Sequence, residues 1–326
     1  MSEKTNGQSV LDITRNRVLK SSSFNIFIVL LLMCIAMYIV SEPFRSIDNV
    51  LAIARNFSSY AIAGVGVSLV IISGGIDLSL GSVFGLAGVI TCMGMVNFGL
   101  PVFPSILLGL ATGALFGLFN GVMVVEAKLP AFIATLGTLS IARSLCYILT
   151  EGYPVTGVET RFLFLGQGYI AGIPTPIWVM AIVAVIFAIF LNKTVTGRRM
   201  YALGGNEEAT RISGISVNKI KLLAYTLCSL LAGFAGIITA SRLGIGQPTA
   251  GQGFELDAIA AVIIGGASLD GGEGTVTGTI LGAAIMGVLR NALVLLSIKS
   301  HWQSLIIGFV IIIAVTADQL KKSRGK

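Results

Sequence analysis

The stretch Tyr201-Ala-Leu-Gly-Gly-Asn-Glu-Glu-Ala-Thr-Arg-Ile-Ser-Gly-Ile215 is a polar island between two long apolar segments. Asn206 is a good helix N-cap, Glu207 and Glu208 suit the positive start of a helix, and Arg211 suits its negative end. Gly214 can end the helix. The pattern predicts a helix of about two turns that lies outside the apolar segments. We expect another protein to hold it.

The composition of the chain indicates whether water or lipid surrounds it. Of its 326 residues, 55% are apolar and 11% are charged, which is more apolar surface than a soluble core can bury. The formal charge of +7 comes from basic residues in short loops and at both ends of the chain, with no basic patch interleaved with aromatic residues. The composition therefore indicates a polytopic membrane protein and argues against nucleic-acid binding.

Apolar spans near the length that a bilayer needs recur along the chain, and several are interrupted. We place them at about 24–41, 56–73, 80–97, 103–126, 131–150, 176–192, 222–242, 257–271, 275–297 and 302–318. The predicted fold is all-α, with about ten transmembrane helices, some of them broken, and one short cytoplasmic helix.

The distribution of basic residues predicts the orientation. Most of the 22 lysines and arginines fall in pieces that share one side if the N-terminus is inside. We therefore expect a cytoplasmic tail at 1–23, one transmembrane domain at 24–318 with a cytoplasmic loop at 193–221, and a cytoplasmic tail at 319–326. The first span has no small-residue cleavage pattern after it, so we expect a retained helix.

Two glycine-rich interruptions resemble each other. Each has an apolar run, a Gly-Gly pair and a Ser/Asp cluster, at Ile71-Ile-Ser-Gly-Gly-Ile-Asp-Leu-Ser79 and at Ile263-Ile-Gly-Gly-Ala-Ser-Leu-Asp-Gly-Gly272. Broken helices at membrane depth often line a translocation path, but tight turns between helices have the same sequence pattern. Polar candidates for the path are Ser73, Asp77, Ser79, Asn120 and Ser268. Asp77 suits either a helix cap or a proton relay.

Four glycines share one face of a predicted helix. Gly109, Gly113, Gly117 and Gly121 follow a strict spacing of four, which allows a neighbouring backbone to approach closely. This face should pack against protein, in the same chain or in a second copy.

Charged residues at the predicted outer side have two interpretations. Arg143, Arg242 and Arg290 lie in the outer halves of their spans, where long basic side chains reach the surface. Glu255 and Asp257 lie near the same mouth. The arginines either snorkel to the surface or face an acidic partner that docks there. Glu255 and Asp257 pair either with these arginines or with a partner.

The chain lacks the residues of common energy-coupling chemistry. Gly266-Ala-Ser-Leu-Asp-Gly271 has the spacing of a phosphate loop, but Gly272 and Glu273 stand where lysine and a hydroxyl belong. Cys34, Cys92, Cys146 and Cys228 are far apart, and the single histidine, His301, gives them no ligand set. We expect no catalytic residue, no metal and no cofactor in this chain, with energy supplied by a separate ATPase.

Several motifs in one order carry a family resemblance. They are Ile72-Ser-Gly-Gly-Ile-Asp-Leu-Ser79, Pro130-Ala-Phe-Ile-Ala-Thr-Leu-Gly137, the 201–215 stretch, Gln247-Pro-Thr-Ala-Gly251 and Phe254-Glu-Leu-Asp-Ala-Ile-Ala-Ala261 with Gly265-Gly-Ala-Ser-Leu269. Together they resemble the permease subunits of ribose-type monosaccharide ABC importers, over residues 50–318.

The resemblance implies partners and roles. It implies a homodimeric permease of the bacterial inner membrane that works with a cytoplasmic ATPase, which binds ATP and Mg, and with a periplasmic sugar-binding protein. It also implies that the loop at 206–214 is the coupling helix in a groove of the ATPase, with Asn206, Glu207, Glu208, Ala209, Arg211, Ile212, Ser213 and Gly214 as its residues. Glu273 departs from the basic residue that relatives often carry after the glycine pair.

Other functions stay open at this point. Related permeases that share the fold carry nucleosides, polyols or branched-chain amino acids, and a stand-alone carrier or channel would need no ATPase. The motifs favour a monosaccharide, ribose or a similar aldose.

Overall fold

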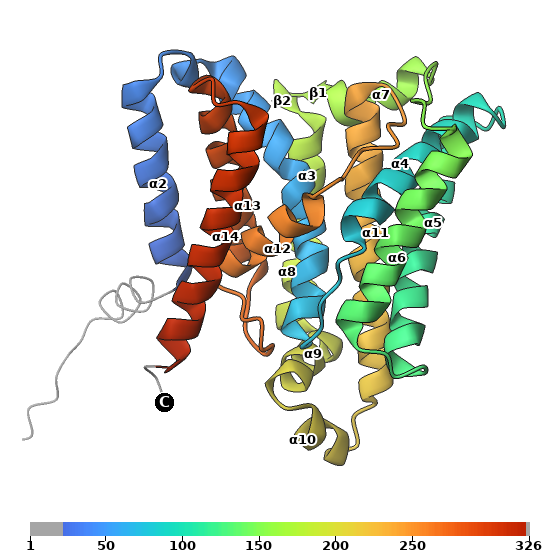
Figure 1. The fold of residues 1–326 in the computed structure, drawn as a ribbon, viewed down its shortest axis with the longest axis vertical. Coiled ribbons are helices and arrows are strands. Elements are labelled where there is room, and N and C mark those ends of the chain that lie inside the picture. The colour runs from blue at the N-terminus through green and yellow to red at the C-terminus, as the bar shows by residue number, and fades with distance from the viewer. Residues whose placement is uncertain (1–21, 324–326) are drawn as a thin grey trace, which may run out of the picture.

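Long helices run side by side through the computed structural model, which describes residues 22–323 (Figure 1). In chain order the elements are α2 (Ser22–Val40), the 3-10 turn η1 (Pro43–Arg45), α3 (Ile47–Ile72), α4 (Leu80–Val96), α5 (Val102–Val125), α6 (Ala131–Thr150), α7 (Thr160–Gln167), β1 (Tyr169–Ile170), β2 (Ile173–Pro174), α8 (Thr175–Lys193), α9 (Val195–Gly205), α10 (Glu207–Ile212), α11 (Val217–Leu243), α12 (Phe254–Ile264), α13 (Val276–Leu295) and α14 (Ser300–Ser323). Of the predicted tails, 1–23 and 319–326, residues 1–21 and 324–326 lie outside the described residues, and α14 extends into the second tail as far as Ser323.

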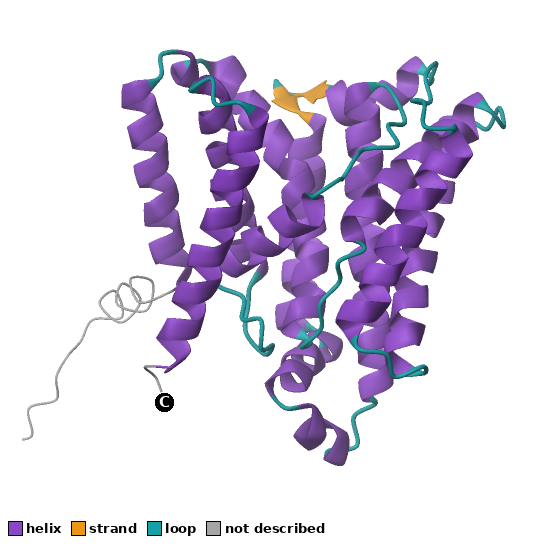
Figure 2. Cartoon of the chain, viewed as in Figure 1, coloured by secondary structure: helices purple, strands orange, loops and turns teal. Residues whose placement is uncertain are grey.

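The all-α prediction is confirmed apart from a small hairpin. Helices make up nearly all of the regular structure, and the two-residue strands β1 and β2 pair antiparallel at one end (Figure 2). The amphipathic helices α7 and α9 were not predicted as separate elements.

Six helices are long and apolar enough to cross a membrane by length and composition, namely α3, α5, α6, α8, α11 and α13. Shorter apolar helical stretches lie in α2, α4 and α14, at Phe24–Val40, Leu80–Val96 and Ser300–Ile313. The prediction of an eighth span at 257–271 is wrong. The helix there, α12, has 11 residues and ends at Ile264, because the glycines that follow leave the helix. Alone it is too short to cross a bilayer.

The two ends of the bundle differ in what they carry. α2 begins and α14 ends at the same end as α9 and α10, which we call the α10 end (Figure 1). α3 and α14 begin, and α11 and α13 end, at the opposite or far end (Figure 1).

The glycine face of α5 packs inside the same chain. Gly109, Gly113, Gly117 and Gly121 are all buried. A Cβ on Gly113 would lie 2.7 Å from the carbonyl oxygen of Ser229 in α11, so the two backbones are in contact. The prediction that this face packs against protein is confirmed, and the neighbour is intrachain.

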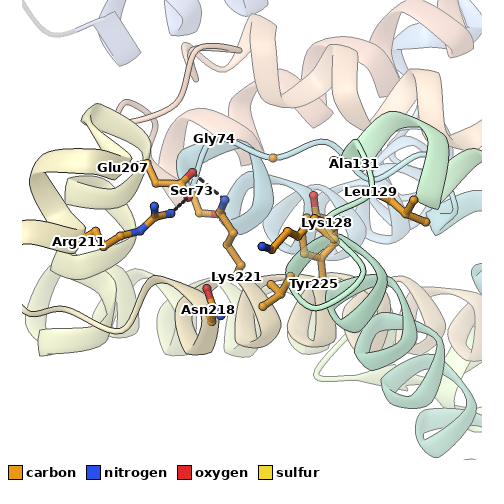
Figure 3. A pocket seen from close by; sticks show the side chains of 13 residues that line it. Ser73, Gly74, Lys128, Leu129, Ala131, Glu207, Arg211, Asn218, Lys221 and Tyr225 are labelled. Carbon is orange, nitrogen blue, oxygen red and sulfur yellow. Dashed lines mark hydrogen bonds and ion pairs between the residues drawn. The ribbon is translucent and has the colours of Figure 1, made fainter.

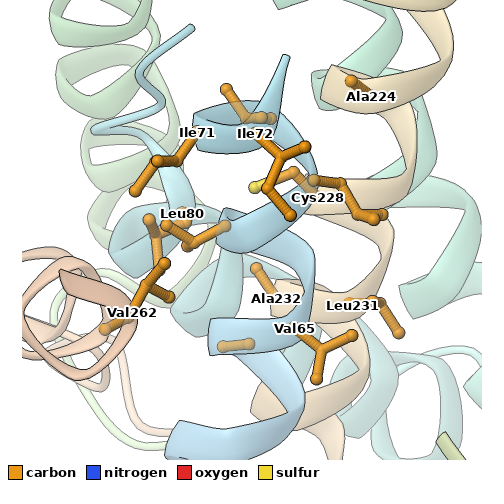
Figure 4. Close-up of a cluster of buried hydrophobic side chains, with 14 of the residues drawn as sticks. Val65, Ile71, Ile72, Leu80, Ala224, Cys228, Leu231, Ala232 and Val262 are labelled. Atoms are coloured by element: carbon orange, nitrogen blue, oxygen red, sulfur yellow. The ribbon is translucent and has the colours of Figure 1, made fainter. Parts of the chain in front are cut away.

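An apolar cluster ties the centre of the bundle together. Ile72 of α3 lies beside Cys228 of α11, and Val65 of α3 lies beside Leu231 of α11, whereas Ile71 points toward Leu80 (Figure 4). The helices outside this centre keep apolar faces exposed. In the apolar stretch of α8, 22% of the residues are buried, whereas 78% are buried in that of α3. α3 is therefore an inner helix, whereas α8 presents a surface suited to lipid.

Two connections run through the body of the bundle instead of staying at its ends. The segment 73–79 leaves α3 at the α10 end and rises to the start of α4, and the segment 244–253 descends from the far end to the start of α12 (Figures 1 and 2). Each pairs a stretch of non-helical backbone with a short helix, as broken membrane helices do.

Candidate coupling and translocation sites

The short helix predicted from the 201–215 stretch is present as α10. The Oδ1 atom of Asn206 accepts a hydrogen bond from the amide of Ala209 at 2.9 Å, and Gly214 has a φ of 78°. Arg211 lies 2.9 Å from Glu207, one turn earlier. Capping, helix-dipole complementarity and the glycine stop all act as the sequence predicted.

α10 presents an apolar side chain at its tip. Ile212 is 79% exposed, and Glu208, Ala209 and Ser213 are exposed around it. A single exposed isoleucine needs no partner, but this one lies on a helix that protrudes beyond the bundle (Figure 1). The helix thus offers an apolar contact ringed by polar groups.

α10 is fixed to the bundle through α11. Lys221 Nζ lies 2.7 Å from Glu207 Oε2, and Thr210 is buried with its hydroxyl donating to the carbonyl of Asn206 at 2.8 Å. The ion pair therefore connects α10 to α11, and the chain connects α10 directly to α9.

The end of α9 contacts both broken segments through glycine backbone. A Cβ on Gly204 would overlap the carbonyl oxygen of Ile72 and the amide nitrogen of Gly272. A Cβ on Gly271 would lie 2.8 Å from the Cα of Gly204 and 3.0 Å from the Cα of Gly74. The amide of Gly272 donates to the carbonyl of Ile72 at 2.9 Å. We call this contact of Gly74, Gly204, Gly271 and Gly272 the glycine junction.

One side-chain bond reinforces the glycine junction. The hydroxyl of Tyr201 in α9 donates to the carbonyl of Gly274 at 2.7 Å. Burial raises the pKa of this hydroxyl, so it remains a donor throughout the neutral range. The two interruptions that look alike in sequence therefore meet at one place, beside the helix that leads into α10.

A cavity of about 710 Å³ opens beside α10 (Figure 3). Ser73 lines it, together with Lys128, Glu207, Arg211 and Lys221. We call it the α10-side cavity. Of the predicted path residues, Ser73 lies here, at the C-cap of α3, with its hydroxyl donating to the carbonyl of Val70 at 2.9 Å.

Three other predicted path residues form a buried network. Asp77 accepts hydrogen bonds from the amide and the hydroxyl of Ser79, at 2.8 and 2.7 Å, and Asn120 donates to the Ser79 hydroxyl at 2.8 Å. The hydroxyl of Ser229 donates to Asp77 at 3.2 Å. Asp77, Ser79, Asn120 and Ser229 are all buried.

This network joins α4 to α5 and α11. Asp77 bonds the amide and the hydroxyl of Ser79, which is the N-cap of α4, and so shapes the turn that leads into this helix. None of the four side chains lines the α10-side cavity or the second cavity described below. Ser229 was not among the predicted residues, because a lone serine in an apolar span gives no local signal.

The fifth predicted path residue, Ser268, belongs to the second glycine-rich interruption, at 263–272. Ser268 is buried, its hydroxyl accepts from the amide of Asp270 at 3.2 Å, and its amide donates to the carbonyl of Glu273 at 3.2 Å. It therefore shapes the turn between α12 and α13.

Arg143 holds two backbone segments together. Its guanidinium donates to the carbonyls of Pro248 and Ala250, at 2.7 and 2.8 Å, and to that of Gly81 at 3.3 Å. A Cβ on Gly251 would overlap the carbonyl oxygen of Gly81. The start of α4 and the segment before α12 are therefore sealed against each other.

Two other predicted arginines line a second cavity. Arg290 pairs with Asp257, and Arg242 donates to the Oδ1 of Asn56. The pairing of Asp257 with an arginine is one of the two arrangements that the sequence allowed. Glu255 lies near Gly81, because a Cβ built on Gly81 would overlap the carboxylate of Glu255.

The second cavity, about 430 Å³, lies at the far end, and we call it the far-side cavity. It is lined by residues of α3, α4, α11, α13 and α14, by the segment before α12 and by Phe254 at the start of α12. The Tyr60 and Phe254 rings stack with centroids 4.7 Å apart, and Phe84 packs on Phe254 at 4.5 Å. Sequence reasoning missed these aromatic residues, since they come from three separate helices.

Metal and redox chemistry find no built site in the residues that the structure describes. Across 22–323, no group of three histidine, cysteine or acidic side chains is placed to hold a metal ion. Cys92, Cys146 and Cys228 are buried free thiols, and Cys34 is a half-buried one.

The architecture fits a membrane transport permease: helices of membrane length, two broken segments that reach the interior, and a short helix that protrudes at one end. The sequence matches over residues 49–315 the family described as "Branched-chain amino acid transport system / permease component". The chain belongs to this family.

Individual relatives are similar over nearly their whole length. The ribose import permease protein RbsC of Haemophilus influenzae is 47% identical over 90% of this chain and 91% of its own. That of Escherichia coli K12 is 45% identical over 90% and 93%. The L-arabinose transport system permease protein AraH of Escherichia coli is 36% identical over 92% and 91%. No solved structure matches.

Proposed function

We infer that this chain is the permease subunit of an ATP-driven ABC importer, and that its substrate is ribose or a similar aldose. The observation that carries the proposal is α10, a capped helix that protrudes at one end and leads through α9 to both broken segments. Two relatives at 45–47% identity over about nine-tenths of each chain are named ribose import permeases, which favours that sugar.

The proposed topology has ten passes with both termini in the cytoplasm. In it, 73–79 with α4 make one pass and 244–253 with α12 make another, so that α12 needs no more length. Lys128, Lys193, Arg198, Arg199 and Lys219 lie at the α10 end, which supports placing that end inside. On this basis 24–318 is one transmembrane domain in the bacterial inner membrane.

We propose that α10 is the coupling helix. It would sit in a groove of a separate cytoplasmic ATPase, with Ile212 as its apolar anchor and Glu208, Ala209 and Ser213 around it. Asn206, Glu207, Arg211 and Gly214 would keep the helix formed. ATP and Mg would be bound by the ATPase, and this chain would supply no catalytic residue.

The glycine junction supports a route from α10 to the path. Backbone in contact with backbone leaves little room for one element to move without the others, since packed interiors are hardly compressible. Movement of α9 would thus displace the end of α3, the start of 73–79 and the turn between α12 and α13 together. Transport would follow as alternating exposure of the path to the two sides.

Two further partners belong to this proposal. A second copy of the permease would complete the path, and a periplasmic sugar-binding protein would dock at the far end. Arg143, Arg242, Glu255, Asp257 and Arg290 were the candidates for that docking. The bonds that Arg143, Arg242, Asp257 and Arg290 make within the chain favour a structural part for these four.

Other functions remain as outcomes of the test. A permease for a nucleoside, polyol or branched-chain amino acid would couple to an ATPase but respond to a different binding-protein ligand. A stand-alone carrier or channel would move solute in liposomes that contain no ATPase.

The test is sugar-stimulated ATP hydrolysis by the importer reconstituted in liposomes. Ile212→Asp should lower the stimulated rate about tenfold or more, because a buried apolar anchor is replaced by a charge. Val195→Asp is the matched control: Val195 is also exposed at the α10 end, but it lies in α9. Full stimulation in the Ile212→Asp variant would refute the docking role.

A further inference from the structure

The α10-side cavity carries an excess of positive charge. The basic side chains that line it are Lys128, Arg211 and Lys221, whereas Glu207 is its one acidic lining residue. We propose that this cavity binds the phosphate of an anionic phospholipid from the membrane leaflet at the α10 end. The proposal rests on the proposed function only in placing that end at the cytoplasmic face of the membrane.

Lys128 supplies a charge that the chain does not neutralise. Within residues 22–323 its side chain forms no ion pair. Its ammonium group points into the cavity, toward the side on which Lys221 and Arg211 lie (Figure 3). Glu126 is close in the chain but does not line the cavity. An anion that enters the cavity therefore meets an ammonium group that has no carboxylate beside it.

The other two cations share one carboxylate. Lys221 Nζ lies 2.7 Å from Glu207 Oε2, and an Arg211 guanidinium nitrogen lies 2.9 Å from Glu207 Oε1. Ammonium and guanidinium groups each have several N–H donors, and one carboxylate does not use them all. Arg211 and Lys221 therefore retain donors for the oxygens of a phosphate group.

The start of α6 adds further donors to the same cavity. Ala131, the first residue of this 20-residue helix, lines the cavity. The amides of a first helical turn have no partner within the helix, and the helix dipole makes this end positive. The helix start thus has the same electrostatic preference as the three basic side chains.

An exposed apolar stripe leads away from the cavity along α6. Leu129 lines the cavity, and Phe132, Ile133 and Leu136 follow it at helical spacing. All four side chains are exposed. A basic pocket between membrane helices on the cytoplasmic side suits an anionic headgroup, and the stripe suits its acyl chains. The volume of about 710 Å³ is ample for a headgroup.

Two other occupants match this surface less well. A second copy of the chain, packed symmetrically on this face, would bring Lys128 and its unneutralised charge against the same positive surface. An acidic segment of a partner protein would match the charge but would leave the apolar stripe uncovered. An anionic phospholipid matches both the charge and the stripe.

The test is a titration of the delipidated full importer, in mild detergent, with dioleoyl phosphatidylglycerol. Native mass spectrometry counts the bound lipid. Lys128→Gln should weaken the apparent affinity about fivefold, because one basic contact to an anionic headgroup is lost. Lys219→Gln is the matched control, since Lys219 is exposed at the same end but does not line the cavity, and it should not weaken binding.

Two further measurements make the result specific. Lys128→Arg keeps the charge and should keep most of the affinity, which a loss caused by damage to the loop would not allow. Dioleoyl phosphatidylcholine has the same acyl chains but no net charge, so it should bind equally to the wild-type importer and to Lys128→Gln.

The alternatives give different outcomes. Equal weakening by Lys128→Gln and Lys219→Gln would refute the site. Displacement of the lipid by glycerol 1-phosphate, which has the phosphate without acyl chains, would assign the cavity to a soluble anion and overturn the proposal. Release of the ATPase by Lys128→Gln with unchanged lipid binding would assign it to that protein. If no ATPase purifies with the chain, the proposed function fails, and the same titration of the chain alone still decides the lipid site.

Discussion

The two ends of this bundle differ in the kind of contact that forms them. At the α10 end, four glycines bring three chain segments into backbone contact with no side chain between them. At the far end, side chains from several helices surround an open cavity of about 430 Å³. The α10 end is therefore closely packed at the backbone, whereas the far end contains an open cavity.

Under the proposed function, the difference separates two tasks. The close backbone contacts of the glycine junction would carry displacement from α9 to the broken segments. The sealed contact between α4 and the segment before α12 lies between the two ends and belongs to both broken passes. Variants at each end should accordingly differ in their effect on coupling.

The largest effect is expected at the glycine junction. Gly204→Ala should abolish sugar-stimulated ATP hydrolysis and lower the free energy of unfolding by about 1–3 kcal/mol, since its Cβ would overlap backbone atoms of Ile72 and Gly272. Gly205→Ala is the matched control, because a Cβ there meets nothing within 4 Å. Thermal unfolding and ATPase assays on both variants check the prediction, and equal behaviour of the two would contradict it.

The next effect is expected at the far end. Tyr60→Leu should lower the free energy of unfolding by about 0.5–1.5 kcal/mol, because it removes the stacking of the Tyr60 ring on Phe254. ATP hydrolysis in the absence of sugar should not change, because the α10 end is untouched. Denaturant titration measures the free energy of unfolding, and an unchanged value would show that the ring pair contributes nothing to stability.

Local chemistry explains what could be predicted from the sequence. The capped helix at 206–214 depends on neighbouring residues, and the glycine face of α5 depends on spacing within one helix, so both were predictable. Asp77 was recognisable as a possible cap for the same reason.

Long-range convergence explains what could not be predicted. Gly204 was recognisable only as a residue that ends a helix, and its contact with Gly271 joins positions far apart in the chain. Tyr60, Phe84 and Phe254 come from three helices, and each alone is an ordinary core residue. The length of α12 was overestimated because apolar residues continue beyond the glycines where the helix ends.

A smaller effect is expected from Tyr201. Tyr201→Phe removes the hydrogen bond to the carbonyl of Gly274 and should lower the free energy of unfolding by about 0.5–1.5 kcal/mol. Coupled ATP hydrolysis should fall in part and not vanish, since the glycine contacts remain. Tyr153→Phe is the control, because that side chain is 74% exposed at the far end. A Tyr201→Phe variant as stable as the control would show that the bond contributes nothing.

The smallest effect is expected from Glu208. Its carboxylate lies 3.6 Å from Arg211, and both side chains are more than half exposed. Glu208→Gln should change the free energy of unfolding by about 0.5 kcal/mol or less, as exposed ion pairs do. Denaturant titration at low and high salt checks this, and a loss above about 1 kcal/mol would mean that α10 depends on the pair.

The most direct measurement follows the far end while the α10 end is driven. Spin labels on Gln247→Cys and Phe103→Cys, placed together in the reconstituted importer, report the distance between the segment before α12 and the start of α5 by double electron–electron resonance; the Phe103 side chain is exposed. ATP should change this distance in the otherwise wild-type chain and with Gly205→Ala, and should leave it unchanged with Gly204→Ala. The same ATP-dependent change with Gly204→Ala would show that the glycine junction does not carry the motion.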